Sequence, residues 1–431
     1  MLFRSPVSAL LHAATLVTAG IYLLLRSSPI LEFSPTALLI ITLIGASTAF
    51  FAASSGLVQN DLKRIIAFST ISQLGYMMMA IGLSQYDVAL FHTVNHAFFK
   101  AMLFLSAGAV IHSFSDQQDI RRMGGLINFL PFVYSVMLVG TLSIMAVPFM
   151  TGFYSKDLII ELAFGQYSFK GMYAYILGSV TAGITAFYSF RLISLVFLTV
   201  PNGPKQSYLE SHESNLTVII PLFILALFSI FFGFISSDLF VGMGSNFFGN
   251  ALFIHPNNIY LIEAEYSLPL IIKQLPAILS LLGALLSIWI YHKQPDFIIS
   301  ITNTNLGKKL YEFLNGKYYF DVIYNKYFIS GGLHLGYTIS KQIDRGIIEL
   351  LGPNGLSNTF SNTAINIAKL DTGIVTTYAL YITIGLLFLI SFVYCSVLFA
   401  IPSALEFPRL IIVLFFALLF QFHYSNLNIT K

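Results

Sequence analysis

Charged side chains are scarce in this sequence of 431 residues. Asp, Glu, Lys and Arg make up 10% of the chain, whereas a soluble domain carries about 25%. Hydrophobic residues make up 56%, with 41 Phe and 23 Tyr among the aromatic residues, so most of the chain is expected to face lipid or other protein. The net charge of only +3 and the lack of a basic run speak against binding of nucleic acid.

Cysteine is almost absent as well. The single Cys395 excludes a disulfide framework, a cysteine-based zinc site and a cysteine-ligated iron–sulfur cluster within the chain. Redox chemistry that this protein takes part in is therefore expected on another subunit.

Long apolar runs, by contrast, are abundant. One crossing of a bilayer needs about 20 mostly apolar residues. Such runs lie at 6–26, 35–55, 62–83, 87–113, 130–163, 171–199, 216–240, 268–292 and 373–400, with a shorter tenth candidate at 408–424. The run 130–163 is too long for one crossing. Because its centre, AVPFMTG at 146–152, combines proline and glycine, we expect two half-helices joined by a break.

Basic loop residues predict the orientation of these spans. With single crossings throughout, nine basic loop residues fall on one face of the membrane, the inside, and Glu263 and Glu265 fall on the other. The nine are Lys63, Arg64, Arg121, Arg122, His292, Lys293, Lys308, Lys309 and Lys317. This orientation also places the N-terminus inside.

The segment 320–370 has the pattern of an amphipathic helix rather than of a span. Its apolar stripe recurs every four positions and consists of Ile339, Ile343, Ile347 and Leu351. Pro353 and the pair Gly331-Gly332 are expected to bend or interrupt the helix. About 50 helical residues reach ~75 Å at ~1.5 Å each, which fits either a membrane-surface anchor or a strut lying across neighbouring subunits.

Three ionisable residues share one face of the run 87–113. His92, His96 and Lys100 are spaced by four, and each such step advances about 40° around an α-helix and about 6 Å along it. Ionisable groups at the centre of a membrane cost roughly 2.5–3.5 kcal/mol or more and therefore mark function, so the column predicts a proton relay. A metal half-site at the histidine pair stays open, although the pattern HExxH is absent. A structural histidine stripe also stays open, although the buried lysine argues against it.

A second ionisable site follows the predicted break. Lys156 and Asp157 lie in the string TGFYSKD, and helix breaks mark ion sites in many transporters. Burial disfavours the charged form of the amine, whereas the neighbouring carboxylate favours it. The lysine is therefore predicted to take and release a proton as its partner moves. The alternative is an interfacial lysine whose amine reaches water.

Two more ionisable residues lie inside runs. His12 is a lone histidine on an apolar face, which by itself is more typical of a satisfied core residue than of a relay. Arg191 is expected to pair with backbone or with a carboxylate and is assigned no catalytic role.

Four long strings resemble, in the same order, the family of NADH–ubiquinone oxidoreductase chain 5, the distal antiporter-like subunit of respiratory complex I. They are SPVSALLHAATLVTAG, NDLKRIIAFSTISQLGYMM, VNHAFFKAMLFLSAGAVIH and PFMTGFYSKDLIIE. The string DRGIIELLGPNG in the segment 320–370 adds to them. The resemblance covers nearly the whole chain and is nearest to mitochondrial members from plants and protists.

The resemblance implies an all-α polytopic membrane protein. It has an antiporter-like five-helix repeat with discontinuous helices, a long amphipathic lateral helix and a C-terminal anchor helix. The expected divisions are the last helix of a first repeat at 1–30, a second repeat that forms the proton channel at 31–200, additional transmembrane helices and loops at 201–319, the lateral helix at 320–371, and the anchor and tail at 372–431.

The resemblance also implies roles for the ionisable residues. By motif, Lys100 would be the central-axis lysine of the second repeat. Lys156, with Asp157, would be the terminal lysine at the exit half-channel. His92, His96 and His12 would be hydrated relay positions, with His12 linking the two half-channels.

The implied function is proton translocation in the membrane arm of complex I, an H+-translocating NADH:ubiquinone reductase of the mitochondrial inner membrane. No cofactor is expected on this chain, because NADH, FMN, iron–sulfur clusters and ubiquinone would lie on other subunits. A subunit of a multi-subunit Na+/H+ antiporter stays open as an alternative, as does a purely structural piece of the membrane arm.

The expected partners are membrane lipids and the other membrane-arm subunits of complex I. Members of the family carry further helices before the motif that begins here at Ser5. We therefore also expect a separate polypeptide that supplies the missing N-terminal helices, with a truncated gene product as the alternative.

Overall fold

The computed structural model describes residues 10–11, 15–242, 244–245, 247–249 and 251–398. The chain divides into two units, Met1–Tyr324 and Asn325–Lys431. The described residues form helices and no β-strand, and the predicted all-α polytopic class is confirmed. His12 and the candidate span 408–424 lie outside the described residues.

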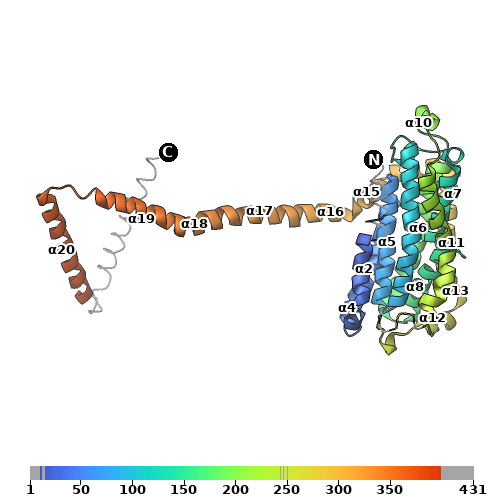
Figure 1. The fold of residues 1–431 in the computed structure, drawn as a ribbon, viewed down its shortest axis with the longest axis horizontal. Helices are drawn as coiled ribbons and strands as arrows, with labels where there is room; N and C mark the ends of the chain where they lie inside the picture. Colours follow the sequence, from blue (N-terminus) through green and yellow to red (C-terminus); the bar gives the residue numbers. More distant parts are fainter. Residues whose placement is uncertain (1–9, 12–14, 243, 246, 250, 399–431) are drawn as a thin grey trace. The chain divides into compact units, whose positions relative to one another are not determined.

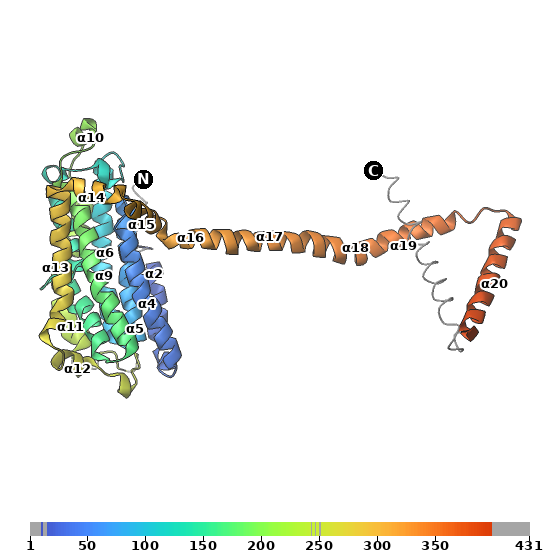
Figure 2. The ribbon, with the colours of Figure 1, turned by 180° about the vertical axis from the view of Figure 1, so that it is seen from behind.

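Among the described residues, six helices of the first unit are long and apolar enough to cross a membrane, and they stand side by side in one bundle (Figures 1 and 2). They are α4 (Pro35–Gly56), α5 (Leu62–Gly82), α6 (Tyr86–Ser113), α9 (Phe169–Ile193, continued by the π-helical turn η5, Ser194–Leu198), α11 (Leu216–Val241) and α13 (Leu270–Lys293). Their ends differ from the predicted runs by no more than two residues, because each run is bounded by polar or turn-forming residues. Of the run 6–26, the described part forms α2 (Leu16–Arg26).

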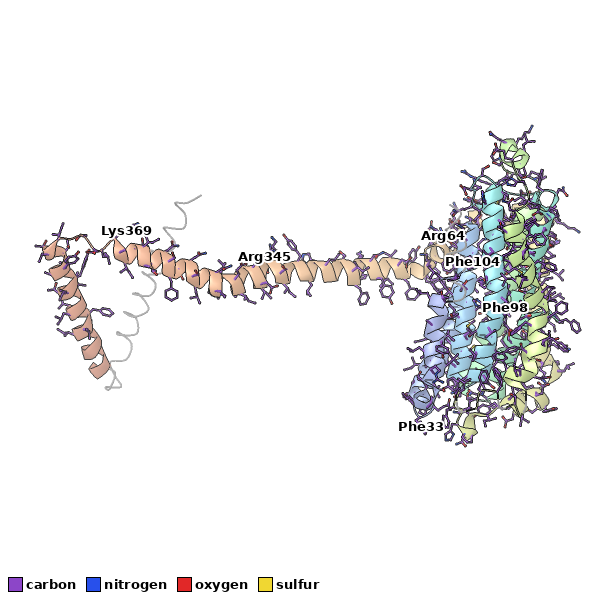
Figure 3. All side chains as sticks on the ribbon, viewed as in Figure 1. Phe33, Arg64, Phe98, Phe104, Arg345 and Lys369 are labelled. Carbon is purple, nitrogen blue, oxygen red and sulfur yellow. The ribbon has the colours of Figure 1, made fainter. Side chains whose placement is uncertain are left out.

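Short helices and turns connect the spans or follow the last of them. They are α3 (Ser28–Leu31), η2 (Ile120–Arg122), η3 (Leu126–Asn128), α10 (Lys205–Leu209), η6 (Pro256–Asn258), α12 (Leu261–Tyr266), α14 (Pro295–Asn303), α15 (Asn305–Asn315), η7 (Lys317–Tyr319) and α16 (Phe320–Ile323). Figure 3 shows Arg64 towards the end where α10 and α15 lie, and Phe33 at the opposite end, near α12. The first turn of α5, which contains Arg64, and α12, which contains Glu263 and Glu265, therefore lie at opposite ends of the bundle, as predicted for these residues.

The predicted break in the run 130–163 is confirmed. Helix α7 (Pro131–Ile144) ends before an irregular segment, and the π-helical turn η4 (Phe153–Asp157) then leads into α8 (Leu158–Gly165). A Cβ at Gly152 would lie 1.8 Å from the carbonyl oxygen of Ser143. Only glycine therefore fits where the chain turns back into a helix.

Proline determines which backbone group the break leaves free. In a continuous helix the carbonyl of Ile144 would accept from the N–H of residue 148, four positions later. Residue 148 is a proline and has no N–H to donate. The carbonyl oxygen of Ile144 is therefore available to another donor at membrane depth.

Small residues allow α4 and α5 to pack closely. A Cβ added at Gly45 would lie 2.6 Å from the backbone nitrogen of Met79, and one added at Gly75 would lie 2.6 Å from that of Ala49. The hydroxyl of Ser72 donates to the carbonyl oxygen of Ala49 at 3.0 Å. Helices associate in membranes through such close backbone contact and hydrogen bonds, because lipid is as apolar as a leucine side chain. The contact fixes the rotation of α5 about its axis and hence the direction of its polar face.

The second unit contains the predicted amphipathic helix. Its helices are η8 (Tyr324–Ile329), which begins at the last residue of the first unit, α17 (Ser330–Thr338), η9 (Ile339–Ile348), α18 (Glu349–Leu351), α19 (Pro353–Ala368) and α20 (Val375–Leu398). The stripe residues Ile339, Ile343, Ile347 and Leu351 are all exposed, so their apolar face has no cover within the described residues.

The two predicted interruptions of this helix have different outcomes. The one at Pro353 is confirmed, since Gly352, with φ of −90° and ψ of −147°, separates α18 from α19. The one at Gly331-Gly332 is wrong, because α17 runs through both glycines. A glycine lowers helix stability by about 1 kcal/mol but, unlike proline, it keeps its N–H and has no ring that clashes with the preceding turn. The π-helical geometry of η8 and η9 was not predicted.

Replacing Gly75 with valine should destabilise the bundle by on the order of 1–3 kcal/mol, because the new side chain overpacks the contact with α4. Thermal unfolding of the detergent-solubilised protein measures the effect. Gly20→Ala on α2 is the matched control, because a Cβ there meets no atom within 4 Å. Equal melting temperatures for both variants would contradict the close α4–α5 contact.

Candidate functional site

Helix α6 carries the predicted row of ionisable side chains into the core of the bundle. His92, His96 and Lys100 are all fully buried. The ring centroids of the two histidines lie 6.4 Å apart, so successive members face the same interior. A buried amine and two buried imidazoles among apolar helices are costly, and each therefore needs an account of its polar contacts.

Among the described residues, Lys100 has one hydrogen-bond partner, which is neutral. Its amine donates to the hydroxyl of Ser69 on α5 at 2.7 Å. A cavity of about 20 Å³ beside it is lined in part by Thr141, Tyr188 and Ser189. That volume is sufficient for one water molecule, and its lining offers hydroxyl groups that can bind one. The amine therefore lies where a proton can be held and passed on.

Lys156 binds the backbone group that the helix break sets free. Its amine donates to the carbonyl oxygen of Ile144 at 3.3 Å and to the hydroxyl of Thr185 on α9 at 3.1 Å. It also lies 5.3 Å from the centre of the Tyr76 ring, a distance at which a cation interacts favourably with an aromatic face. Since Lys156 is 1% exposed, the alternative of an amine that reaches water does not apply.

His92 connects the two lysine-bearing elements. Its Nδ1 lies 2.9 Å from the hydroxyl of Ser155, the residue before Lys156, and its Nε2 lies 3.1 Å from Oε1 of Gln73 on α5. Neither ring nitrogen of His96 has a hydrogen-bond partner among the described residues. The row therefore contains one histidine that is fully engaged and one that is free to bind.

Asp157 and Arg191 complete the buried charged groups that the sequence singled out. Oδ2 of Asp157 is buried and without a hydrogen-bond partner among the described residues, and Asp157 and Lys156 do not form one of the ion pairs that these residues contain. Arg191 donates to the backbone carbonyl of Gln59 at 2.5 Å and to the side chain of Asn60 at 2.8 Å. The predicted backbone partner of Arg191 is thus confirmed.

The described residues offer no ligand set for the alternative of a metal half-site at His92 and His96. Among the described residues, no group of three or more His, Cys, Asp or Glu side chains could hold a metal ion. His92 directs its nitrogens towards a hydroxyl and an amide oxygen instead. His12, the remaining predicted relay position, lies outside the described residues.

Sequence reasoning missed the uncharged residues that contact these ionisable side chains. Ser69, Gln73 and Tyr76 lie on α5, and their contacts are with Lys100, His92 and Lys156 respectively. A signal was available, because with Ser72 they occupy positions i, i+3, i+4 and i+7 and so form a polar stripe on an apolar span. Ser155 and Thr185 gave no comparable signal.

Comparison with known proteins agrees with this arrangement. A family model described as "NADH:quinone oxidoreductase/Mrp antiporter, TM" matches residues 4–185. Another, described as "NADH dehydrogenase subunit 5 C-terminus", matches residues 244–393. The first model covers every described residue of the ionisable row, and the second covers all of the segment 320–370.

Individual relatives carry one name. The chain is 70% identical over 427 residues, 99% of its length, to NADH-ubiquinone oxidoreductase chain 5 of Schizophyllum commune, of which it covers 62%. It is 64% identical to the protein of that name from Mycosarcoma maydis and 48% identical to the one from Marchantia polymorpha. Each match covers 90% of this chain, and the chain covers 57% and 58% of the two relatives, respectively. The fungal identities exceed that of the liverwort, so the expectation of nearest likeness to plants and protists is wrong.

The chain thus spans somewhat less than two thirds of these relatives, and both family descriptions and all three names concern one group of membrane proteins. Over nearly its whole length this chain is therefore similar to members of the NADH-ubiquinone oxidoreductase chain 5 family.

Proposed function

We propose that this chain translocates protons in the membrane arm of respiratory complex I. The observation that carries the proposal is the buried row of Lys156, His92, His96 and Lys100, which runs from the break after α7 to α5 and α6. An imidazole takes a proton at one nitrogen and releases one from the other, and a buried amine with neutral partners alternates between its charged and neutral forms. Such a row has the groups that a proton needs to cross an apolar bundle.

In this proposal each residue has a distinct task. Lys156 holds a proton between the Ile144 carbonyl and the Thr185 hydroxyl, and Lys100 holds one beside Ser69. His92 and His96 pass protons between them, and Asp157 supplies a buried carboxylate next to Lys156. His12 keeps its predicted relay role. Residues 31–200 would form the proton channel.

The rest of the complex supplies the driving reaction. The names of the relatives describe an NADH–ubiquinone oxidoreductase, so we place NADH, FMN, iron–sulfur clusters and ubiquinone on other subunits and this chain in the mitochondrial inner membrane. The chain would be an enzyme subunit without redox chemistry of its own. The Na+/H+ antiporter alternative is not favoured, because the second family model and the relatives concern chain 5.

The segment 320–371 would be the lateral helix, and α20 would be the anchor. The uncovered apolar stripe of this helix supports contact with lipid and with neighbouring membrane-arm subunits, since exposed apolar patches mark such contacts.

Replacing Lys100 or Lys156 with methionine removes the amine and keeps the stem of the side chain. Each change should slow proton transfer through this chain on the order of a hundredfold, the loss typical for a group that carries a proton. Proton pumping by the intact complex in vesicles, measured against NADH oxidation, reports the loss. Lys170→Met is the control, because that lysine binds the carbonyl of Gly82 at 3.3 Å, away from the row. Normal pumping in both variants would favour the purely structural role.

Replacing Ile343 and Ile347 together with lysine should release the lateral helix from the surface that it covers. The expected result is less assembled membrane arm, with near-normal pumping in the complexes that do assemble. Native gel electrophoresis followed by a pumping assay separates the two effects. The matched control replaces Ser340 and Gln342, which lie outside the apolar stripe, with lysine, and it should leave assembly unchanged. Equal assembly of both double variants would contradict the proposed contact.

A further inference from the structure

His92 has both of its ring nitrogens engaged on the side of Lys156. In a neutral imidazole one nitrogen donates and the other accepts. Because Oε1 of Gln73 can only accept, Nε2 of His92 carries the hydrogen and donates to it, and Nδ1 accepts from the hydroxyl of Ser155. No nitrogen of His92 is left to bind His96.

His96 differs from His92 in its hydrogen bonds. Both of its nitrogens are buried without a hydrogen-bond partner among the described residues. The ring of Phe99 packs edge-on against His96, with centroids 5.4 Å apart, and also lies 6.5 Å from His92. The apolar ring of Phe99 therefore lies against both imidazoles, where a continuous row would need a hydrogen-bonded link between His92 and His96.

Gln73 is unusually placed for a structural residue. It is fully buried on α5, its only hydrogen bond among the described residues is the one to His92, and its Nε2 has no partner there. A buried amide with an unpaired nitrogen is unfavourable, and a leucine of similar volume would avoid that cost. The position of Gln73 is therefore explained by its bond to His92.

We propose that Gln73 is a positioning residue that, with Ser155, holds His92 disconnected from His96, so that the Lys156 and Lys100 parts of the row exchange protons only after this bond breaks. The proposal rests on the proposed function and adds to it the place at which the row is closed. Its physical purpose follows directly, because a row that conducted at all times would let protons flow back through the membrane.

The test is the passive proton permeability of the intact complex in vesicles. A pH gradient is imposed without NADH, and its decay is followed with a pH-sensitive dye. Gln73→Met keeps the volume of the side chain and removes the oxygen that accepts from His92. The gradient should then decay about fivefold faster, because the loss of one buried hydrogen bond shifts an equilibrium by about that factor. Gln166→Met is the matched control, because that buried glutamine binds the carbonyl of Leu83 at 3.0 Å, at the end of α5, and its decay should equal that of the wild type.

A double variant identifies the route of the leak. Gln73→Met with His92→Phe removes the imidazole nitrogens, so the decay should return to the wild-type rate. A leak that survives in the double variant would show a packing defect and would overturn the proposal. Wild-type decay in Gln73→Met would overturn it too.

Ser155→Ala provides a second measurement if Gln73→Met fails to assemble. It removes the other bond to His92 by a small change on a different element, and it should also speed the decay. Wild-type decay in Ser155→Ala would then reject the proposal. The lysine variants keep this result apart from the proposed function, because reduced pumping in Lys100→Met together with a tight Gln73→Met complex would reject only the inference about Gln73.

Discussion

The hydrogen bond from Lys156 to the carbonyl oxygen of Ile144 is the contact on which the rest of the site depends. Inside a membrane every backbone polar group needs a partner, and water is not at hand to supply it. Pro148 removes the partner of that carbonyl, and the lysine replaces it. The same break directs the π-helical turn η4 so that Ser155 faces His92. One missing N–H therefore accounts both for the place of the amine and for the link between η4 and α6.

The partners of the buried lysines are neutral oxygen atoms rather than carboxylates. The ion pairs among the described residues lie at exposed or partly exposed positions and are Arg64–Asp61, Arg121–Asp119 and Lys317–Asp321. A carboxylate in contact with Lys100 or Lys156 would stabilise the charged amine and would retain its proton. Hydroxyl and carbonyl partners bind the charged form less strongly, so each amine can also lose its proton. The chemistry of the partners thus suits transfer rather than storage.

The sequence predicted the features that break a strong rule. Three such features stand out against the surrounding residues: a charge within an apolar run, a spacing of four on a helix, and proline with glycine at membrane depth. From them we predicted the described spans, the break, and the burial of Lys100 and Lys156. Ser155 and Thr185 break no such rule, because uncharged polar residues are ordinary inside membrane helices. Their roles depend on which helix faces which, and that is set by the Gly45 and Gly75 contacts between α4 and α5. The error at Gly331-Gly332 has a related cause, since glycine weakens a helix without removing a hydrogen bond.

The close packing of α4 against α5 and the buried row on α6 are parts of one arrangement. Ser69, Gln73 and Tyr76 reach Lys100, His92 and Lys156 from a single stripe of α5. A rotation of α5 by one residue, about 100°, would turn all three away together. Because backbone contact with α4 leaves no room for a larger side chain at Gly75, α5 is held in the one rotation that serves three sites. A shift of α5 would therefore change the contacts of both lysines and of His92 at once.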